Sequence, residues 1–268
     1  MIHRDGREIA RKNEQHMLKM LHKFGFLRTR DLAALVWAPS RSVPQKGGFM
    51  VEAVVVSASA LRMAQRTLRR LRENRLVFDH LGPDGSLLYG LSEGGARVLQ
   101  GLDIPAKSSK NWLRCFSMAQ YHHRRLANEI AISAMLQGYR TATEREIAGG
   151  LWLGGMGGVL GKKPDVLARS GKSVWWIEVE RSRKNKTDYA KLINWLQQMW
   201  SRHPGPADRV ELPGEHKLEK VAFIAGRAFG AKLAVDLKKC GWTDAQISLR
   251  ILHIPLLYVT DTKFLTLR

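Results

Sequence analysis

Two neighbouring segments near the middle of the chain carry acidic residues in a strand pattern. Residues 163–169 and 173–181 each read as a strand, and the Ser-Gly-Lys sequence between them predicts a tight turn. Side chains alternate faces along a strand, so Glu178 and Glu180 share one face, and Asp165 lies on the neighbouring strand. Carboxylates gathered on one face are costly unless a cation lies among them, and oxygen ligands suit divalent cations. The pattern predicts a metal site.

A second interpretation is that these acids form salt bridges with Arg169, Arg181 and Arg183 on a solvated edge. The residues before Glu178 argue against it, because Trp-Trp-Ile is typical of a buried strand. Buried acids rarely lack a partner. We therefore favour a metal-dependent phosphodiesterase site over a solvated edge.

The chain is strongly basic. It has 268 residues with 44 Lys and Arg against 24 Asp and Glu, a formal net charge of +20. Net charge does not determine a fold, but it favours a polyanionic partner. Both halves of the chain carry the excess, so we expect a nucleic-acid footprint spread over two folded units rather than one basic tail.

The first 101 residues predict a small helical domain that ends in a hairpin. Apolar residues recur at helical spacing over residues 11–24, and Gly25 ends that helix. Thr29 is expected to cap the second helix, and Ser57 or Ser59 the third, which runs to about Asn74. Strands then follow at 76–81 and 87–91 around a Pro-Asp-Gly turn, and Ser92 begins a closing helix. This order predicts a winged helix-turn-helix, in which the third helix enters the major groove.

The polar faces of the third predicted helix are almost purely basic. Glu73 is the one acidic residue between Arg62 and Arg75. A run of charges on a helix is ordinarily interpreted as a solvated face. Such a face usually mixes charges of both signs, and this one does not. We therefore expect this helix to contact double-stranded DNA through Arg62, Gln65, Arg66, Arg69, Arg70 and Arg72.

Residues 102–116 read as a linker, and residues 117–268 predict a mixed sheet with helices on both faces. The fold class is thus α+β or α/β. The expected elements, in order, are a helix over 117–138, a strand over 141–147, a glycine-rich loop, the two acidic strands, a helix capped by Thr187, a strand over 220–225, a helix over 228–239 and a strand region over 250–259. The glycine-rich loop is not a phosphate-binding loop, because Met156 stands where that motif needs glycine and Lys163 replaces Ser or Thr.

The Pro-Asp strand followed by Glu-x-Glu resembles the PD-(D/E)xK nuclease superfamily. The resemblance implies a restriction-endonuclease-like core in which Asp165 and Glu178 bind Mg²⁺ or Mn²⁺. Glu180 stands at the position of the lysine that orients or activates water in that superfamily, and it would be a third carboxylate ligand.

The positive charge missing at that position needs another source, and Arg181, Lys184 and Lys186 are the candidates, with Lys184 taken as the catalytic one. Members of the superfamily often carry an acid on the preceding helix. Glu129 matches this acid and follows closely after His123. Glu129 and His123 are both accessory candidates.

As an ordering of elements over about residues 11–200, the chain resembles the replication-relaxation family. The specific features are Leu-Ser-x-x-Gly at 91–95, the run Tyr121 to Asn128 and the two acidic strands. The resemblance implies a relaxase-like endonuclease that nicks DNA at a plasmid or integrative-element origin during mobilisation or conjugation. It further implies relaxosome or replication proteins as partners and leaves room for a homodimer. The alternative is a non-catalytic DNA-binding accessory, or a replication or transcription regulator, with a degenerate nuclease fold.

The remaining sequence features predict an ordinary cytoplasmic protein. Cys115 and Cys240 form neither a disulfide framework nor a zinc motif, and they read as buried thiols in a reducing compartment. The first residues lack a signal-peptide pattern, and no apolar run has the length of a membrane span, so no membrane partner is expected. Nothing around Tyr121, Tyr189 or Tyr258 marks an activated nucleophile.

Overall fold

The chain is a mixed α+β protein that divides into two compact units. The computed structural model describes residues 5–45, 48–114, 117–180, 185–203, 205 and 208–256. The first unit comprises residues 1–40 and 54–128, and the second comprises residues 41–53 and 129–268. The division differs from the predicted one, because it falls inside a helix and assigns residues 41–53 to the second unit.

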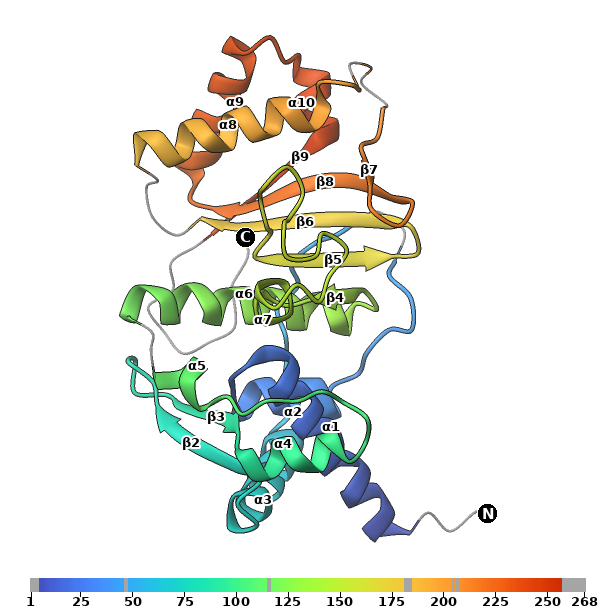
Figure 1. Cartoon of the computed structure of the whole chain (residues 1–268), viewed down its shortest axis with the longest axis vertical. Helices are drawn as coiled ribbons and strands as arrows, with labels where there is room; N and C mark the ends of the chain where they lie inside the picture. The colour runs from blue at the N-terminus through green and yellow to red at the C-terminus, as the bar shows by residue number, and fades with distance from the viewer. Residues whose placement is uncertain are drawn as a thin grey trace. The chain divides into compact units, whose positions relative to one another are not determined.

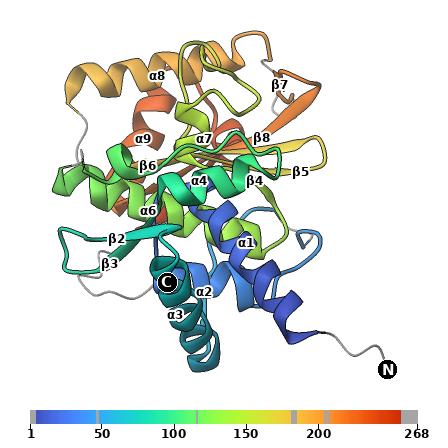
Figure 2. The same ribbon diagram turned by 60° about the horizontal axis from the view of Figure 1, so that its bottom comes forward.

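The first unit combines helices with a small sheet (Figure 1). In chain order its elements are α1 (Gly6–Phe24), β1 (Leu27–Arg28), α2 (Thr29–Trp37), α3 (Ala58–Glu73), β2 (Val77–Leu81), β3 (Leu87–Leu91), α4 (Glu93–Gln100), α5 (Lys110–Arg114) and the start of α6 (Met118–Leu136). The strands are antiparallel in the order β1-β3-β2. Helix α3 contacts β2, and Figure 2 shows α3 beside the β2–β3 hairpin.

Helix ends in this unit follow local chemistry. Gly25 adopts φ 85° and ends α1, as its sequence position predicted. The hydroxyls of Ser57 and Ser92 accept hydrogen bonds from Ala60 N and Gly95 N at the starts of α3 and α4. The predicted cap at Thr29 is wrong. Helix α2 is capped one residue earlier, because the Asp31 carboxylate accepts from the backbone N and the guanidinium of Arg28.

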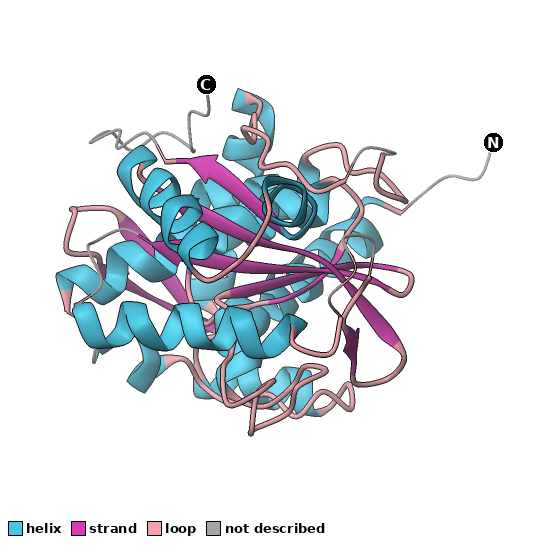
Figure 3. Ribbon diagram, turned by 90° about the horizontal axis from the view of Figure 1, so that it is seen from above, coloured by secondary structure: helices cyan, strands magenta, loops and turns pink. Residues whose placement is uncertain are grey.

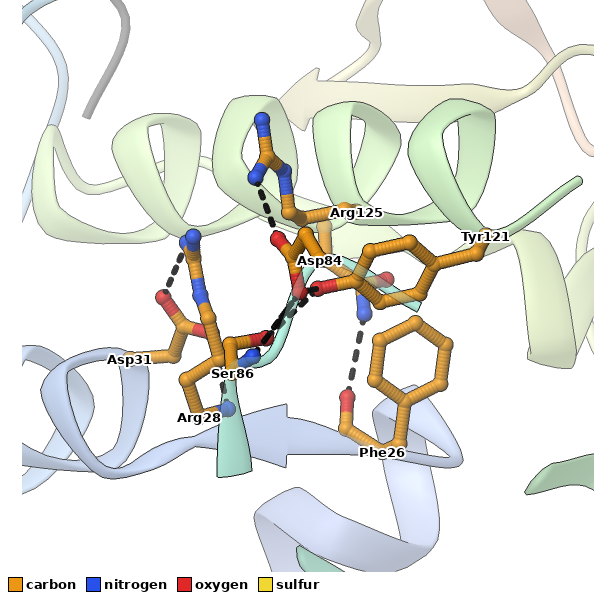
Figure 4. Close-up of polar contacts among 8 residues, drawn as sticks. Phe26, Arg28, Asp31, Asp84, Ser86, Tyr121 and Arg125 are labelled. Atoms are coloured by element: carbon orange, nitrogen blue, oxygen red, sulfur yellow. Dashed lines mark hydrogen bonds and ion pairs between the residues drawn. The ribbon is translucent and has the colours of Figure 1, made fainter. Parts of the chain in front are cut away.

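The turn of the β2–β3 hairpin is fixed by a partly buried polar cluster centred on Asp84 (Figure 4). The Asp84 carboxylate accepts from Ser86 Oγ at 2.6 Å and from Tyr121 Oη at 2.8 Å. Its second oxygen accepts from Arg125 Nη1 at 2.9 Å. Burial raises the pKa of Asp84, but the hydrogen bonds and the Arg125 charge outweigh it and lower that pKa to about 2. The cluster ties the hairpin tip to α6.

The second unit is built on a six-stranded mixed sheet. Its elements are the end of α6, β4 (Arg140–Ala142), α7 (Glu144–Ala148), β5 (Val166–Ser170), β6 (Ser173–Glu180), α8 (Lys186–Trp200), β7 (Glu211–Leu212), β8 (His216–Ala225), α9 (Arg227–Lys239), α10 (Asp244–Arg250) and β9 (Ile251–Pro255). Strands β4, β5 and β6 are antiparallel neighbours, whereas β6, β8 and β9 run parallel. Short β7 pairs antiparallel with β8.

Helices cover both faces of this sheet, as the element order predicted. Figure 1 shows α8, α9 and α10 on one face and the end of α6 on the other, and Figure 3 shows the strands enclosed by helices. The core under α8 is rich in tryptophan. The rings of Trp176 and Trp195 lie 4.9 Å apart, and those of Trp152 and Trp176 lie 5.7 Å apart.

The segment of residues 41–53 joins the second unit through backbone contacts with the end of α6. Arg41 N donates to Leu136 O at 2.8 Å, and Gln137 Nε2 donates to Met50 O at 2.7 Å. Gly138 has φ +92° there, and a Cβ would lie 2.7 Å from the backbone of Val43. The segment therefore packs against a site where no side chain fits, which explains its assignment to the second unit.

Several predicted features of residues 102–268 differ in the structure. Residues 141–147 were expected to form one strand, but the strand ends at Ala142 because Thr143 and Glu146 form a capping box that begins α7. Asn185, not Thr187, caps α8. Helix α10 lies between the predicted helix over 228–239 and the predicted strand region over 250–259, where no element was predicted. Residues 257–259 of that strand region lie outside the described residues.

The predicted burial of both cysteines is wrong for Cys240, which is exposed, while Cys115 lies outside the described residues. In the part of the chain that the structure describes, no helix combines the length and the apolar character needed to cross a bilayer.

Replacing Asp84 should destabilise the protein in a pH-dependent way. Because the folded pKa of Asp84 lies below its ordinary value of 3.8, its ionised form stabilises the fold above about pH 4, and this contribution is lost as the pH falls through about 2. We expect D84N to lower the free energy of unfolding by about 2 kcal/mol at pH 7. Urea unfolding between pH 2 and pH 7 would measure it.

The matched control is D103N. Asp103 is exposed and has φ 59°, a conformation that asparagine tolerates well. The D103N protein should have the same free energy of unfolding as the wild type at every pH. A D84N protein with wild-type stability at pH 7 would contradict the anchoring role of the cluster.

Candidate functional site

Asp165 lies one residue before β5, close to Glu178 of β6. The β5–β6 register begins at the pair of Val166 and Ile177. Two hydrogen bonds join Asp165 to β6. Asp165 N donates to Ile177 O at 3.0 Å, and Val179 N donates to Asp165 Oδ2 at 2.7 Å. The Asp165 charge is close enough to raise the pKa of Glu178, so these two carboxylates predicted from the sequence are brought together.

Glu178 is buried, and each of its carboxylate oxygens accepts a hydrogen bond. Its relative exposure is 3%. Lys162 Nζ donates to Oε2 at 2.6 Å, and Trp176 Nε1 donates to Oε1 at 2.6 Å. Burial raises the pKa of Glu178, and the neighbouring Asp165 charge adds to this, while Lys162 and Trp176 act in the opposite direction. The site thus keeps a carboxylate in a poorly solvated position beside a second acid and a lysine.

Lys162 was not among the predicted site residues. It ends a tight turn in the glycine-rich loop, in which Val159 and Lys162 pair through backbone hydrogen bonds of 2.9 and 3.1 Å. Its ammonium lies 5.6 Å from the centroid of the Trp195 ring. The sequence signal for Lys162 is its place three residues before Asp165, at the end of the glycine-rich loop.

The structure describes only some of the other residues that the sequence predicted for this site. Glu180 is the last residue of β6 and is buried, paired in register with Ala225 of β8. Glu129 is buried on α6. Across the residues that the structure describes, no three His, Cys, Asp or Glu side chains form a group suited to a metal ion. Arg181 and Lys184 lie outside the described residues, and Lys186 is exposed at the start of α8.

Helix α3 in the first unit presents the predicted basic face to solvent. Its buried face consists of Ala60, Ala64, Thr67, Leu68 and Leu71. All six predicted DNA-contact residues are exposed: Arg62, Gln65, Arg66, Arg69, Arg70 and Arg72.

Two of these arginines are partly neutralised by acids of the first unit. Arg70 pairs with Glu14 at 3.0 Å, and Arg72 lies 3.5 Å from Asp79. Among the described residues, Arg62, Arg66 and Arg69 form no ion pair with an acidic side chain. Gln65, Arg69 and Arg72 also line a polar hollow of about 370 Å³ with Tyr89 of β3. The exposed face of α3 therefore holds uncompensated positive charge.

The tyrosines offer no activated nucleophile in the described part of the chain. Burial raises the pKa of Tyr121 to about 12, and the Asp84 carboxylate that accepts its hydrogen bond contributes to the rise. Burial also raises the pKa of Tyr189. Tyr258 lies outside the described residues, and His123 is a half-buried residue of α6 in the first unit.

Comparisons of the chain with protein-family models, curated proteins and solved structures gave no match. The interpretation of both sites therefore depends on their own residues.

Two substitutions at Asp165 should separate its structural role from its charge. D165N keeps an oxygen that can accept from Val179 N, whereas D165A leaves that buried donor without its acceptor. We expect D165A to lose about 2 kcal/mol of stability and D165N to lose less than half as much. Equal losses in urea unfolding would contradict the role of this hydrogen bond.

Proposed function

We propose that the chain is a DNA-binding, metal-dependent endonuclease, with a winged helix-turn-helix in the first unit and a PD-(D/E)xK-type nuclease core in the second. One observation carries the proposal: Asp165 and Glu178 lie close together where β5 and β6 begin to pair, with Lys162 on Glu178. Paired carboxylates beside a lysine are suited to phosphodiester hydrolysis, in which a metal and a cation offset the charge of the phosphate.

The basic face of α3 supports DNA as the substrate. Arg62, Arg66 and Arg69 are exposed and form no ion pair among the described residues, so phosphates could neutralise them without breaking an existing bridge. The order α1, α2, α3 and then the β2–β3 hairpin is that of a winged helix, in which α3 would enter the major groove. The net charge of +20 agrees with a polyanionic substrate.

The topology of the second unit supports the nuclease core. The resemblance implies a core of a helix, three strands and a helix, and α6, β4, β5, β6 and α8 occur in this order, with α7 between β4 and β5. The order of elements supports the nuclease-like fold and not the activity, because one fold can carry many functions.

The acidic pair suits Mg²⁺ or Mn²⁺. Magnesium is usually bound by one or two protein carboxylates together with waters and substrate phosphate, so Asp165 and Glu178 are sufficient without a third acid. Their carboxylate oxygens would be the ligands that the chain offers to the metal. When bound, the metal would lower the pKa of a coordinated water and offset charge on the phosphate.

A second candidate is a non-catalytic DNA-binding accessory with a degenerate nuclease fold. The saturation of Glu178 favours it, because both oxygens already accept hydrogen bonds and the side chain is buried, as in a structural ion pair. Glu180 at the position of the usual lysine also favours it. Plasmid or integrative-element mobilisation, with an origin as the target, remains the biological setting that the resemblance proposes for either candidate.

The endonuclease proposal predicts metal-dependent nicking that requires the Asp165 charge. The substrate would be supercoiled plasmids carrying the DNA that flanks the chain's own coding sequence, with an unrelated insert as control. We expect conversion to open circles with Mg²⁺ or Mn²⁺, and a loss of at least about 100-fold in D165N, which keeps the strand pairing. DNA binding should survive in D165N. Binding without nicking in any divalent metal would favour the accessory.

The DNA-binding proposal predicts a specific change in salt dependence. Because each phosphate contact contributes about 0.9 to the slope of log K against log salt, R66A/R69A should lower that slope by about 2 and weaken binding at least about tenfold at 0.1 M salt. R97A removes an exposed arginine from α4 of the same unit and serves as the control. A double variant that matches R97A in slope would remove α3 from the interface.

A further inference from the structure

The acidic site needs a cation where a phosphate would approach, and β6 does not supply one. Glu180 occupies the strand position two residues after Glu178. We propose that Lys162, delivered by the glycine-rich loop before β5, is the positioning residue that supplies this charge, orienting Glu178 and binding the scissile phosphate of DNA. The inference rests on the proposed endonuclease function.

The placement of Lys162 between core and solvent supports this role. The side chain of Glu178 is 4% exposed, whereas that of Lys162 is 24% exposed. Lys162 therefore keeps partial contact with solvent beside an acid that has almost none. A lysine ammonium has three N–H donors, and Glu178 Oε2 accepts one of them at 2.6 Å. The other two are available to the oxygens of a phosphate that approaches Asp165 and Glu178.

The turn that carries Lys162 is held in an unfavourable conformation. Leu160 and Gly161 have φ 50° and 76°, and positive φ at a leucine costs about 1–2 kcal/mol. Burial does not compensate for this cost, because Leu160 is 56% exposed. Backbone strain of this kind persists when surrounding contacts determine the conformation, and it concentrates at functional sites.

Contacts on both sides of Leu160 hold the turn. On one side Trp195 Nε1 donates to Val159 O at 3.0 Å. On the other, Lys162 contacts Glu178 and lies against the Trp195 ring. Trp195 thus contacts both ends of the turn, and together with Glu178 of β6 it holds the lysine at a fixed position.

The test compares K162M with K163M under conditions where protein saturates the DNA. Lys163 is the next residue, is half-buried and carries the same charge, so K163M controls for a general loss of positive charge. We expect K162M to nick at least about 100-fold more slowly than wild type, and K163M to stay within about threefold. DNA affinity should change less than threefold in both.

Two further measurements separate positioning from structure. In K162A the missing ammonium leaves a space that ethylammonium can enter. Added ethylammonium should therefore raise the nicking rate of K162A at least tenfold. Without DNA or metal, intrinsic tryptophan emission should change in K162M but not in K163M, because the Lys162 ammonium lies 5.6 Å from the Trp195 ring.

Each outcome supports or overturns a defined statement. If wild type never nicks, the endonuclease and the role of Lys162 both fall. If wild type nicks and K162M matches K163M, the role of Lys162 alone falls. A slow K162A that ethylammonium does not rescue would assign Lys162 a purely structural role. Should K162M lose the wild-type circular dichroism spectrum, K162Q, whose amide can still donate to Glu178, takes its place.

Discussion

The burial of Glu178 in the middle of a tryptophan-rich core is the constraint on which the second unit depends. A carboxylate with 3% exposure is tolerable only when its oxygens are satisfied, and Trp176 and Lys162 do this at 2.6 Å each. The need to satisfy the oxygens of Glu178 explains where Trp176 and Lys162 lie. Trp176 lies two residues earlier on the same face of β6, and Lys162 comes from a loop whose turn is held by Trp195. A single buried charge therefore links strand β6, the glycine-rich loop and helix α8.

In the first unit, too, one acid holds separate elements together. Asp84 lies in a hairpin turn, where an aspartate ordinarily binds only its own loop. Here it also accepts from Tyr121 and Arg125, so the tip of the hairpin is fixed to α6. Helix α3, beside this hairpin, keeps its arginines on the surface because its small and apolar residues occupy the buried face. Rigid support behind an exposed basic face is what a DNA-contact surface requires, since ordering flexible side chains on binding costs affinity.

Local chemistry explains which parts of the fold were predictable. The hairpin, α3 and the second acidic strand follow from periodicity, a turn signal and capping serines, and they lie close to their predicted bounds. The first acidic strand begins at Val166, after the predicted start at residue 163, so Asp165 lies just before it. The errors have local causes as well. A capping box at Thr143 and Glu146 outweighed the alternation that suggested a strand, and an Arg28–Asp31 pair displaced the predicted cap at Thr29. The docking of residues 41–53 had no sequence signal, because it depends on backbone groups meeting the end of α6.

The sequence by itself determined that Asp165 and Glu178 belong to two neighbouring strand segments, since a tight turn joins two strand patterns. It also determined the basic composition and the exposed face of α3. Only the tertiary structure decided which cation meets Glu178. That choice depends on how a glycine-rich loop folds back over the sheet, and its glycines allow many conformations that local sequence cannot rank. The contacts with Trp195 and Glu178 select the one that brings Lys162 to the acid.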